Sequence, residues 1–342
     1  MKLNLSVRKI AEITGAELIS SAPDTVVTSF VTDSRVVAPG DAFIALKGQK
    51  HDARKFIPDV LSKGAAVILA EKGFDVAQKA NVSFLLVEDS LKALQALAKY
   101  HRLNSTLKVA AITGSNGKST TKQMLRAICE TAGETAANMG NFNNQFGVPF
   151  SLLEIQPKHK YGIFELGASH PGDILETASL AVPDVAVITN VGPSHLEFFH
   201  NLETIYKTKT EIAQCLNFGG TLVYNADDEY LSRLKTEFKG KSLSFGFHPG
   251  ADLQILDTEK FSFTYKGEAY VLDLNLARHD KLNAAAAAAA AIALGLYMDN
   301  VKKGLLSFTP MPMRMEHLHQ KGVEFILDCY NANPASMKNA LE

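Results

Sequence analysis

The chain has 342 residues, too many for one typical domain, and its 46% apolar and 21% charged content is ordinary for globular proteins. Its formal net charge of −1 gives no bulk attraction to nucleic acid or anionic membranes, and no apolar run approaches the ~18 residues of a membrane span. The three cysteines (Cys129, Cys215 and Cys329) are isolated, and an odd count without C-x-x-C argues against a disulfide framework or a zinc knuckle. We therefore expect a cytoplasmic protein with no nucleic-acid or membrane partner.

Residues 1 to about 105 alternate short apolar runs with turns, which predicts a small α/β domain. Within it we expect strands over 42–46 and 65–70, with a short helix over 56–62 between them. Residues 91–102 have the apolar spacing of an amphipathic helix that leads into the next domain.

From residue 106 to about 315 the pattern changes to alternating strands and helices, which predicts a doubly wound, mostly parallel sheet. The expected strands are 108–113, 161–166, 184–190 and 221–225. Ligands bind beyond the carboxyl ends of such strands, and polar groups follow all four. These groups are the glycine loop after 113, Glu165, residues 190–195 and residues 225–228, of which the last are mainly a turn and helix start.

The first of these strands is followed by the pattern G-x-x-G-K-S-T and then by a helical pattern. Backbone N–H groups at such a turn face an anion, the lysine supplies charge, and a hydroxyl can hold Mg²⁺. The pattern predicts a bound nucleoside triphosphate, contacted by Gly114, Ser115, Asn116, Gly117, Lys118, Ser119 and Thr120. The general P-loop would carry its first glycine where this chain has Ile112, so the shorter form indicates a particular subset of ATP-using enzymes.

Eight consecutive alanines over 284–291 predict a helix that packs closely on the sheet. A linker near 310–312 is followed by a strand over 323–328, a turn over 331–334 and the start of a helix. Because these elements cannot form a core, we expect residues 316–342 to be the start of a Rossmann-like third domain that is cut off.

These motifs resemble those of the Mur ligases, the ATP-dependent amide-forming enzymes of peptidoglycan synthesis. Residues 113–121 are similar to their ATP motif, and residues 33–35, 39–41 and 45–48 resemble the N-terminal UDP-binding domain of the MurE and MurF branches. Residues 141–149, 165–171 and 330–334 resemble the MurF branch, which joins D-alanyl-D-alanine to UDP-N-acetylmuramoyl-tripeptide through an acyl phosphate. The resemblance runs from about residue 30 to the last residue and implies ATP, Mg²⁺ at two positions and a role in cell wall synthesis. We expect a monomer.

The resemblance also implies catalytic roles. Lys118 would reach the β- and γ-phosphates, while Ser119 and Glu165 would bind Mg²⁺ and His195 a second Mg²⁺. Lys209 would be N-carboxylated by CO₂, although composition alone suggests only a solvated basic helix there. A carboxylate at the position of Glu165 is costly unless it meets a cation.

Further residues are candidates for binding. Asn141, Asn143, Asn144 and Gln145 form an amide run that suits a sugar-nucleotide or peptide substrate, the alternative being an Asn-rich turn. By resemblance, Ser34 and Arg35 would contact UDP, Asn283 and His279 the adenine, Arg314 the phosphates and Asp328 the ribose. The family's Asp-Gly-His-x-Phe motif is altered at residues 52–56, so no role is assigned there.

Two other functions remain open at this point. One is a MurE-type ligase that adds the third amino acid, which the motifs at 141–149 and 330–334 disfavour. The other is a non-catalytic nucleotide-binding module, since Arg314 and Asp328 would lack most of their supporting domain. A GTPase-like switch is disfavoured because no N-K-x-D-like signature occurs in a β-α context.

Overall fold

The computed structural model describes residues 2–20, 22–48, 52–73, 82–138, 140–310, 313, 316–329 and 337. Its contacts divide the chain into two compact units. Unit 1 comprises residues 1–105 with 149–155, and unit 2 comprises residues 106–148 with 156–342. The division into three domains stays a prediction.

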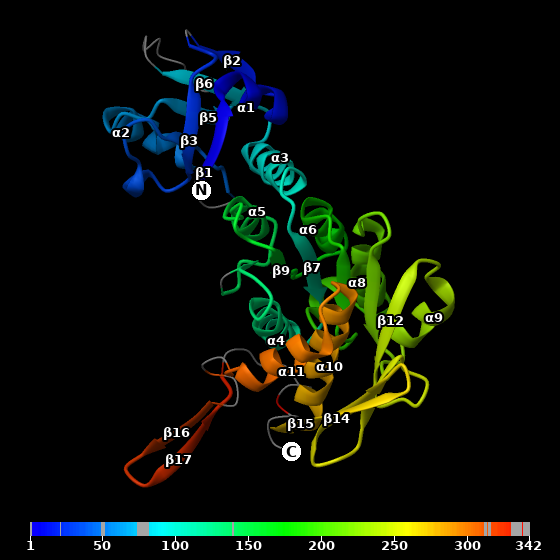
Figure 1. Cartoon of the computed structure of the whole chain (residues 1–342). Coiled ribbons are helices and arrows are strands. Elements are labelled where there is room, and N and C mark those ends of the chain that lie inside the picture. Colours follow the sequence, from blue (N-terminus) through cyan, green and yellow to red (C-terminus); the bar gives the residue numbers. More distant parts are fainter. Residues whose placement is uncertain are drawn as a thin grey trace. The chain divides into compact units, whose positions relative to one another are not determined.

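Unit 1 contains a six-stranded sheet in the order β1-β3-β4-β5-β6-β2, shown at the blue end of the chain in Figure 1. The four inner strands are parallel, and β1 and β2 pair antiparallel at the edges. The strands are β1 (Lys2–Ser6), β2 (Glu17–Ile19), β3 (Val26–Val31), β4 (Ala42–Ile44), β5 (Val67–Glu71) and β6 (Ser83–Val87). The helices are α1 (Val7–Thr14), η1 (Ser34–Val36), η2 (Ala53–Phe56), α2 (Ile57–Ser62) and α3 (Ser90–Leu103).

The core of unit 1 explains why its predicted elements form. Phe43, Ile68 and Phe84 come from three neighbouring strands and are buried against Ile57 and Val60 of α2. The β-branched and aromatic residues of these strands favour the extended backbone. The predicted strands over 42–46 and 65–70 and both predicted helices are present, with ends displaced by at most two residues.

Unit 2 is built on a nine-stranded sheet in the order β15-β14-β13-β12-β11-β10-β7-β9-β8. The strands are β7 (Lys108–Thr113), β8 (Thr135–Ala137), β9 (Tyr161–Glu165), β10 (Val185–Ile188), β11 (Thr221–Asn225), β12 (Lys241–Gly246), β13 (Leu253–Leu256), β14 (Lys260–Tyr265) and β15 (Glu268–Asn275). Neighbours from β8 to β13 are parallel, whereas β13, β14 and β15 pair antiparallel. The predicted mostly parallel sheet is confirmed, and the antiparallel extension is additional.

The helical elements of unit 2 are α4 (Lys118–Glu130), α5 (Gly147–Leu153), α6 (Asp173–Ala181), α7 (Leu196–Phe199), α8 (Leu202–Thr210), η3 (Glu211–Cys215), η4 (Leu231–Arg233), α9 (Leu234–Glu237), α10 (Arg278–Ala293) and α11 (Met298–Ser307). Of these, α5 crosses into unit 1 at residue 149. Ala110 and Ile112 of β7 pack with Met124 and Leu125 of α4 and with the α10 alanines, so α4 and α10 lie on one face of the sheet (Figure 1).

The predicted alanine helix is α10, and residues 284–291 are all completely buried. Their small side chains allow the helix backbone to approach its neighbours closely. A similar close approach occurs where α11 meets α4, because a Cβ at Gly304 would lie 2.3 Å from the Cα of Ile128. Close packing of small residues therefore holds α4 against both α10 and α11 (Figure 1).

Beyond α11 the structure describes an antiparallel hairpin of β16 (Glu316–Gln320) and β17 (Val323–Leu327). The strand predicted over 323–328 is β17, whereas its partner β16 was not predicted. Within the described ranges, no helix has the length and apolar character required to cross a membrane.

Candidate active site

The glycine loop joins the carboxyl end of β7 to the start of α4. Gly114 has φ +149° and Gly117 has φ +80°, backbone conformations that L side chains rarely adopt. A Cβ at Gly114 would lie 1.9 Å from Oγ1 of Thr189, and one at Gly117 would lie 2.2 Å from Oδ1 of Asn283. Both positions therefore require glycine for backbone conformation and for space.

The loop that follows β10 holds the glycine loop through hydrogen bonds. The hydroxyl of Ser115 donates to the carbonyl of Gly192 at 2.8 Å, and the Asn116 N–H donates to Oδ1 of Asn190 at 2.9 Å. The hydroxyl of Thr189 donates to the Asn116 carbonyl at 2.6 Å. These bonds hold the glycine loop against residues 189–192.

Lys118 is the first residue of α4 and folds back over the loop. Its ammonium donates to the carbonyls of Gly114 and Ser115 at 2.8 and 3.1 Å. The lysine charge is thus held beside the loop and the amino end of α4, where an anion would be stabilised by both.

Glu165, the last residue of β9, is the centre of a buried polar cluster. Its Oε2 accepts a hydrogen bond from the Ser119 hydroxyl at 2.8 Å, and its Oε1 accepts one from Nδ2 of Asn143, also at 2.8 Å. The ammonium of Lys122 lies 3.8 Å from the same Oε2, with both side chains at most 4% exposed. The cation that a carboxylate here requires is therefore Lys122, which sequence reasoning missed although it lies on the apolar face of the predicted helix.

Asn138 attaches the asparagine-rich run to the end of β9. Its Nδ2 donates to the carbonyls of Phe142 and Glu165, both at 2.9 Å, and its Oδ1 accepts the Glu165 N–H at 3.0 Å. Oδ1 of Asn144 accepts the N–H groups of Phe146 and Gly147, at the start of α5. The run thus contains both a residue that contacts Glu165, Asn143, and a turn-forming residue, Asn144.

Asn141 and Gln145 complete the predicted amide run. Asn141 is exposed, and its carbonyl accepts the N–H of Asn143 at 2.7 Å. Gln145 is half-buried. A role in substrate binding stays a prediction for all four amides of the run.

His195 and Lys209 lie within electrostatic range of the glycine loop. His195 has φ +49° and precedes α7, and its pKa is lowered by partial burial and then by the charges of Lys118 and Lys209. Lys209, on α8, is 4% exposed, and burial holds the pKa of its amine well below the ordinary value, with a further contribution from Lys118. The expectation of a solvated basic helix is therefore wrong for Lys209, and it fits only Lys207, whose side chain is exposed.

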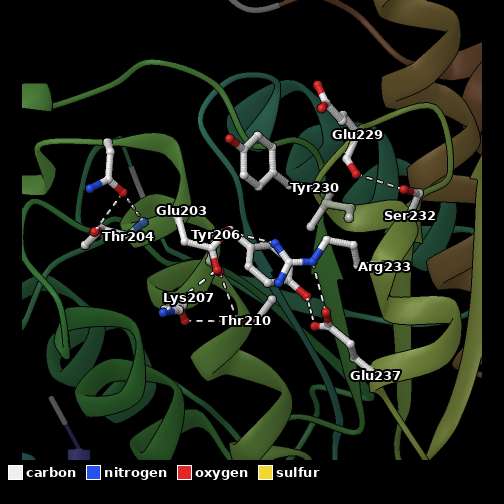
Figure 2. A network of polar contacts seen from close by, with 12 residues as sticks. Glu203, Thr204, Tyr206, Lys207, Thr210, Glu229, Tyr230, Ser232, Arg233 and Glu237 are labelled. Atoms are coloured by element: carbon white, nitrogen blue, oxygen red, sulfur yellow. Dashed lines mark hydrogen bonds and ion pairs between the residues drawn. The ribbon is translucent and has the colours of Figure 1, made fainter.

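Glu203 and Tyr206 of α8 take part in a set of contacts with Arg233 and Glu237 that we call the α8 surface network (Figure 2). Arg233 donates to Glu203 at 2.8 Å and to Glu237 at 2.9 Å, and its guanidinium lies 4.5 Å from the centre of the Tyr206 ring. The Tyr206 hydroxyl donates to Glu237 at 2.5 Å, and burial followed by this carboxylate raises the pKa of Tyr206. The network ties the helix that carries Lys209 to η4 and α9.

The predicted metal ligands are only partly brought together. Ser119 and Glu165 are in direct contact, whereas no contact joins either of them to His195 among the interactions described. Across the described ranges, no three His, Cys, Asp or Glu side chains converge as a metal site would require. One carboxylate and one hydroxyl nevertheless fit Mg²⁺, which usually takes one or two carboxylates and completes its shell with phosphates and water.

The residues predicted to contact adenine lie at the start of α10. Asn283 is buried against the glycine loop, and its Oδ1 accepts a hydrogen bond from the Thr121 hydroxyl at 3.4 Å. His279 is half-buried with Nε2 3.4 Å from Asp280. Asp328 is half-buried after β17, and Arg314 lies outside the described residues. Asn283 thus lies beside the glycine loop, and contact with adenine stays a prediction.

The predicted UDP contacts belong to unit 1. Ser34 is buried, and its carbonyl accepts the ammonium of Lys63 at 2.8 Å. Arg35 is exposed and binds both carboxylate oxygens of Asp33, lowering the pKa of that carboxyl to about 2. Ser34 is thus next to the Asp33–Arg35 ion pair, whose guanidinium is exposed, and contact with UDP stays a prediction for Ser34 and Arg35.

Comparison with known proteins adds an independent observation. Residues 112–291 match the model of the Mur ligase middle domain, and residues 26–102 match that of the Mur ligase family catalytic domain. The UDP-N-acetylmuramoyl-tripeptide–D-alanyl-D-alanine ligase of Buchnera aphidicola subsp. Acyrthosiphon pisum is 33% identical over 351 residues, covering 99% of this chain and 76% of the relative.

Two solved structures give the same result. The crystal structure of MurF from Acinetobacter baumannii aligns with a TM-score of 0.92 at 33% identity, covering 99% of this chain and 76% of that one. The MurF ligase from Thermotoga maritima in complex with ADP aligns with a TM-score of 0.83 at 32% identity, covering 92% of this chain and 74% of that one. The chain therefore belongs to the Mur ligase family and, within it, to the MurF branch.

Proposed function

We propose that this chain forms an ATP-dependent ligase that joins D-alanyl-D-alanine to UDP-N-acetylmuramoyl-tripeptide. The observation that carries the proposal is the juxtaposition of Lys118, Ser119 and Glu165 at the carboxyl edge of the sheet, in a chain 33% identical to a ligase with that activity. The relative bound to ADP supports a nucleotide at the glycine loop.

The residues present suit phosphoryl transfer to a carboxylate. The substrate carboxylate attacks the γ-phosphorus, the bond to ADP breaks, and the amine of D-alanyl-D-alanine then displaces phosphate from the acyl phosphate. Backbone N–H groups of the rigid loop and the ammonium of Lys118 would stabilise the negative charge that develops on the phosphoryl oxygens. Because the loop is held by Ser115 and Asn116, little reorganisation is needed when the nucleotide binds.

Ser119 and Glu165 would hold Mg²⁺ against the phosphates. When bound, Mg²⁺ would neutralise charge on the β- and γ-phosphate oxygens. The hydroxyl–carboxylate contact of 2.8 Å already places two oxygen ligands side by side. His195 is the candidate for the second cation, and its lowered pKa favours the neutral imidazole that coordinates metals.

We also propose that Lys209 carries a carbamate. The amine is buried, and its lowered pKa favours the neutral form, which is the nucleophile toward CO₂. No hydrogen bond of its amine is seen among the residues that the structure describes. A carbamate would convert this buried amine into an anion near Lys118 and His195, both of which lie within electrostatic range.

Release of ADP and phosphate tests the proposed function. The protein, in its longest natural form, is incubated with ATP, Mg²⁺ and UDP-N-acetylmuramoyl-tripeptide, with and without D-alanyl-D-alanine. We expect release that depends on D-alanyl-D-alanine and a product whose mass contains both substrates. Release that is independent of the dipeptide would overturn the assignment.

The same assay separates the two other functions. A MurE-type ligase would use the dipeptide nucleotide and a free amino acid instead of the tripeptide nucleotide. A non-catalytic module would bind ATP in calorimetry without releasing ADP under any of these conditions.

A further inference from the structure

Lys122 is a buried cation that the proposed function leaves unexplained. It lies one turn after Lys118 on α4, and only 1% of its side chain is exposed. Leu125, three residues further along the same face of the helix, belongs to the apolar core. Burying an ammonium is strongly unfavourable unless a counter-charge and hydrogen bonds compensate for its lost hydration.

Two groups provide that compensation. The ammonium of Lys122 donates to the carbonyl of Asn138 at 3.0 Å and lies 3.8 Å from Oε2 of Glu165. The side-chain amide of Asn138 in turn donates to the backbone carbonyl of Glu165 and accepts the backbone N–H of Glu165. Lys122 therefore interacts with Glu165 in two ways. It lies beside the carboxylate of Glu165, and it holds Asn138, which binds the backbone of Glu165.

We propose that Lys122 is a positioning residue for Glu165. It supplies the buried counter-charge that keeps the carboxylate turned toward Ser119, and it fixes Asn138 at the start of the asparagine-rich run. This inference rests on the proposed function, which assigns Ser119 and Glu165 to the Mg²⁺ that accompanies the nucleotide. Lys122 would act on that Mg²⁺ through Glu165 and Asn138, and it is not itself assigned as a ligand.

The geometry gives the reason for a cation at this position. Two uncharged donors, Ser119 and Asn143, bind opposite oxygens of the carboxylate. When bound, Mg²⁺ would take an oxygen of this carboxylate. Asn143, on Oε1, and Lys122, beside Oε2, are the groups that would hold the carboxylate in its orientation.

The test measures Mg²⁺ binding without relying on turnover. The unfolding temperature of the ADP-bound protein is followed as Mg²⁺ is added, and the Mg²⁺ concentration at half of the increase is recorded. For Lys122→Met we expect this concentration to rise by about 10-fold or more, the usual effect of removing a group that orients a metal ligand. Lys122→Arg, which keeps the charge, should recover most of the loss.

The matched control is Arg126→Met, which removes another cation of α4, one that is exposed and pairs with the exposed Glu130. Its half-saturating Mg²⁺ concentration should equal that of the unaltered protein. A value for Lys122→Met within twofold of the unaltered protein would overturn the inference. If Lys122→Met does not fold, Lys122→Met with Glu165→Gln should fold again, because the uncompensated carboxylate is gone; failure of this double variant overturns the inference as well.

The outcome also distinguishes the inference from the proposed function. If Mg²⁺ does not stabilise the unaltered protein with ADP, the proposed metal site fails. If Mg²⁺ stabilises it and Lys122→Met behaves identically, only the role of Lys122 fails.

Discussion

Two polar networks in unit 2 use the same kinds of side chain in different surroundings. The cluster around Glu165 is buried, and its lysine and carboxylate are almost completely shielded from water. The α8 surface network around Arg233 has closer ion pairs, at 2.8 and 2.9 Å, but its charged side chains are more than 40% exposed (Figure 2). Distance alone would rank the surface network as the stronger.

Burial reverses that ranking. Water and salt screen the exposed charges, so ion pairs at a surface contribute little to stability. In the buried cluster each charge depends on its partner, because removal of either one leaves the other without hydration. The comparison therefore predicts large effects around Glu165 and small ones around Arg233.

The largest effect is expected for Glu165→Ala. It leaves the ammonium of Lys122 buried without a counter-charge, which lowers the free energy of unfolding by about 3–5 kcal/mol, and it removes the proposed Mg²⁺ ligand. Chemical denaturation and the ADP-release assay measure the two losses. Glu130→Ala, which removes an exposed carboxylate paired with Arg126, is the control; equal effects of the two substitutions would refute the importance of burial.

Asn138→Ala should have an intermediate effect. Its amide makes three hydrogen bonds to backbone groups, two of them to the buried backbone of Glu165, and leaving such buried groups unsatisfied lowers the free energy of unfolding by about 1–3 kcal/mol. The same denaturation experiment measures it. The exposed Asn141 makes no side-chain hydrogen bond among the described interactions, so Asn141→Ala should be close to neutral, and a larger loss there would contradict the assignment.

In the surface network the largest effect is expected from its most buried member, Tyr206. Tyr206→Phe removes one hydrogen bond to Glu237 and should cost about 0.5–1.5 kcal/mol. Tyr230→Phe is a matched control, since the hydroxyl of Tyr230 makes no hydrogen bond among the described residues. A change in ADP release without a change in stability would instead connect this tyrosine directly to the site.

The smallest effect is expected for Glu237→Gln, at about 0.2–1 kcal/mol. The Tyr206 hydroxyl, followed by Arg233, lowers the pKa of Glu237 below its ordinary value of 4.5. The unfolded chain therefore binds this proton first as pH falls, so the contribution of Glu237 is present above that value and is lost below it. Unfolding of the two proteins measured across this range, at low and high salt, should show the difference shrinking with acid and with salt; a difference that persists in both would contradict a screened surface pair.

The comparison also explains which parts of the site were predictable. The glycine loop and Glu165 were predicted because each depends on a local pattern. The loop is a glycine-rich turn directly after a strand, and Glu165 is a charged residue at the end of a strand. Lys122 was missed because its partner is distant in sequence, and a lysine in a helical pattern normally faces solvent. The burial of Lys209 depends on how α8 packs, which its own sequence does not reveal.

The fold shows the same division between local and long-range information. The parallel strands β7, β9, β10 and β11 are continuous apolar runs, which is typical of strands buried on both faces. The predicted elements include no strand between β11 and α10, although β14 alternates apolar and polar residues and ends in a turn at residues 266–267, a hairpin signal. The pairing of β16 with β17 likewise requires a partner that an isolated strand pattern does not specify.

The alanine run of α10 leaves the position of that helix along its axis poorly determined by packing. Eight identical side chains would fit almost as well after a shift of one turn, because uniform packing specifies a unique arrangement weakly. The ends must therefore set the register: Lys281 and Asn283 at one end, and at the other the carbonyl of Leu294, which accepts a hydrogen bond from Lys108. Since Asn283 also lies against Gly117, a shift of this helix along its axis would displace the glycine loop.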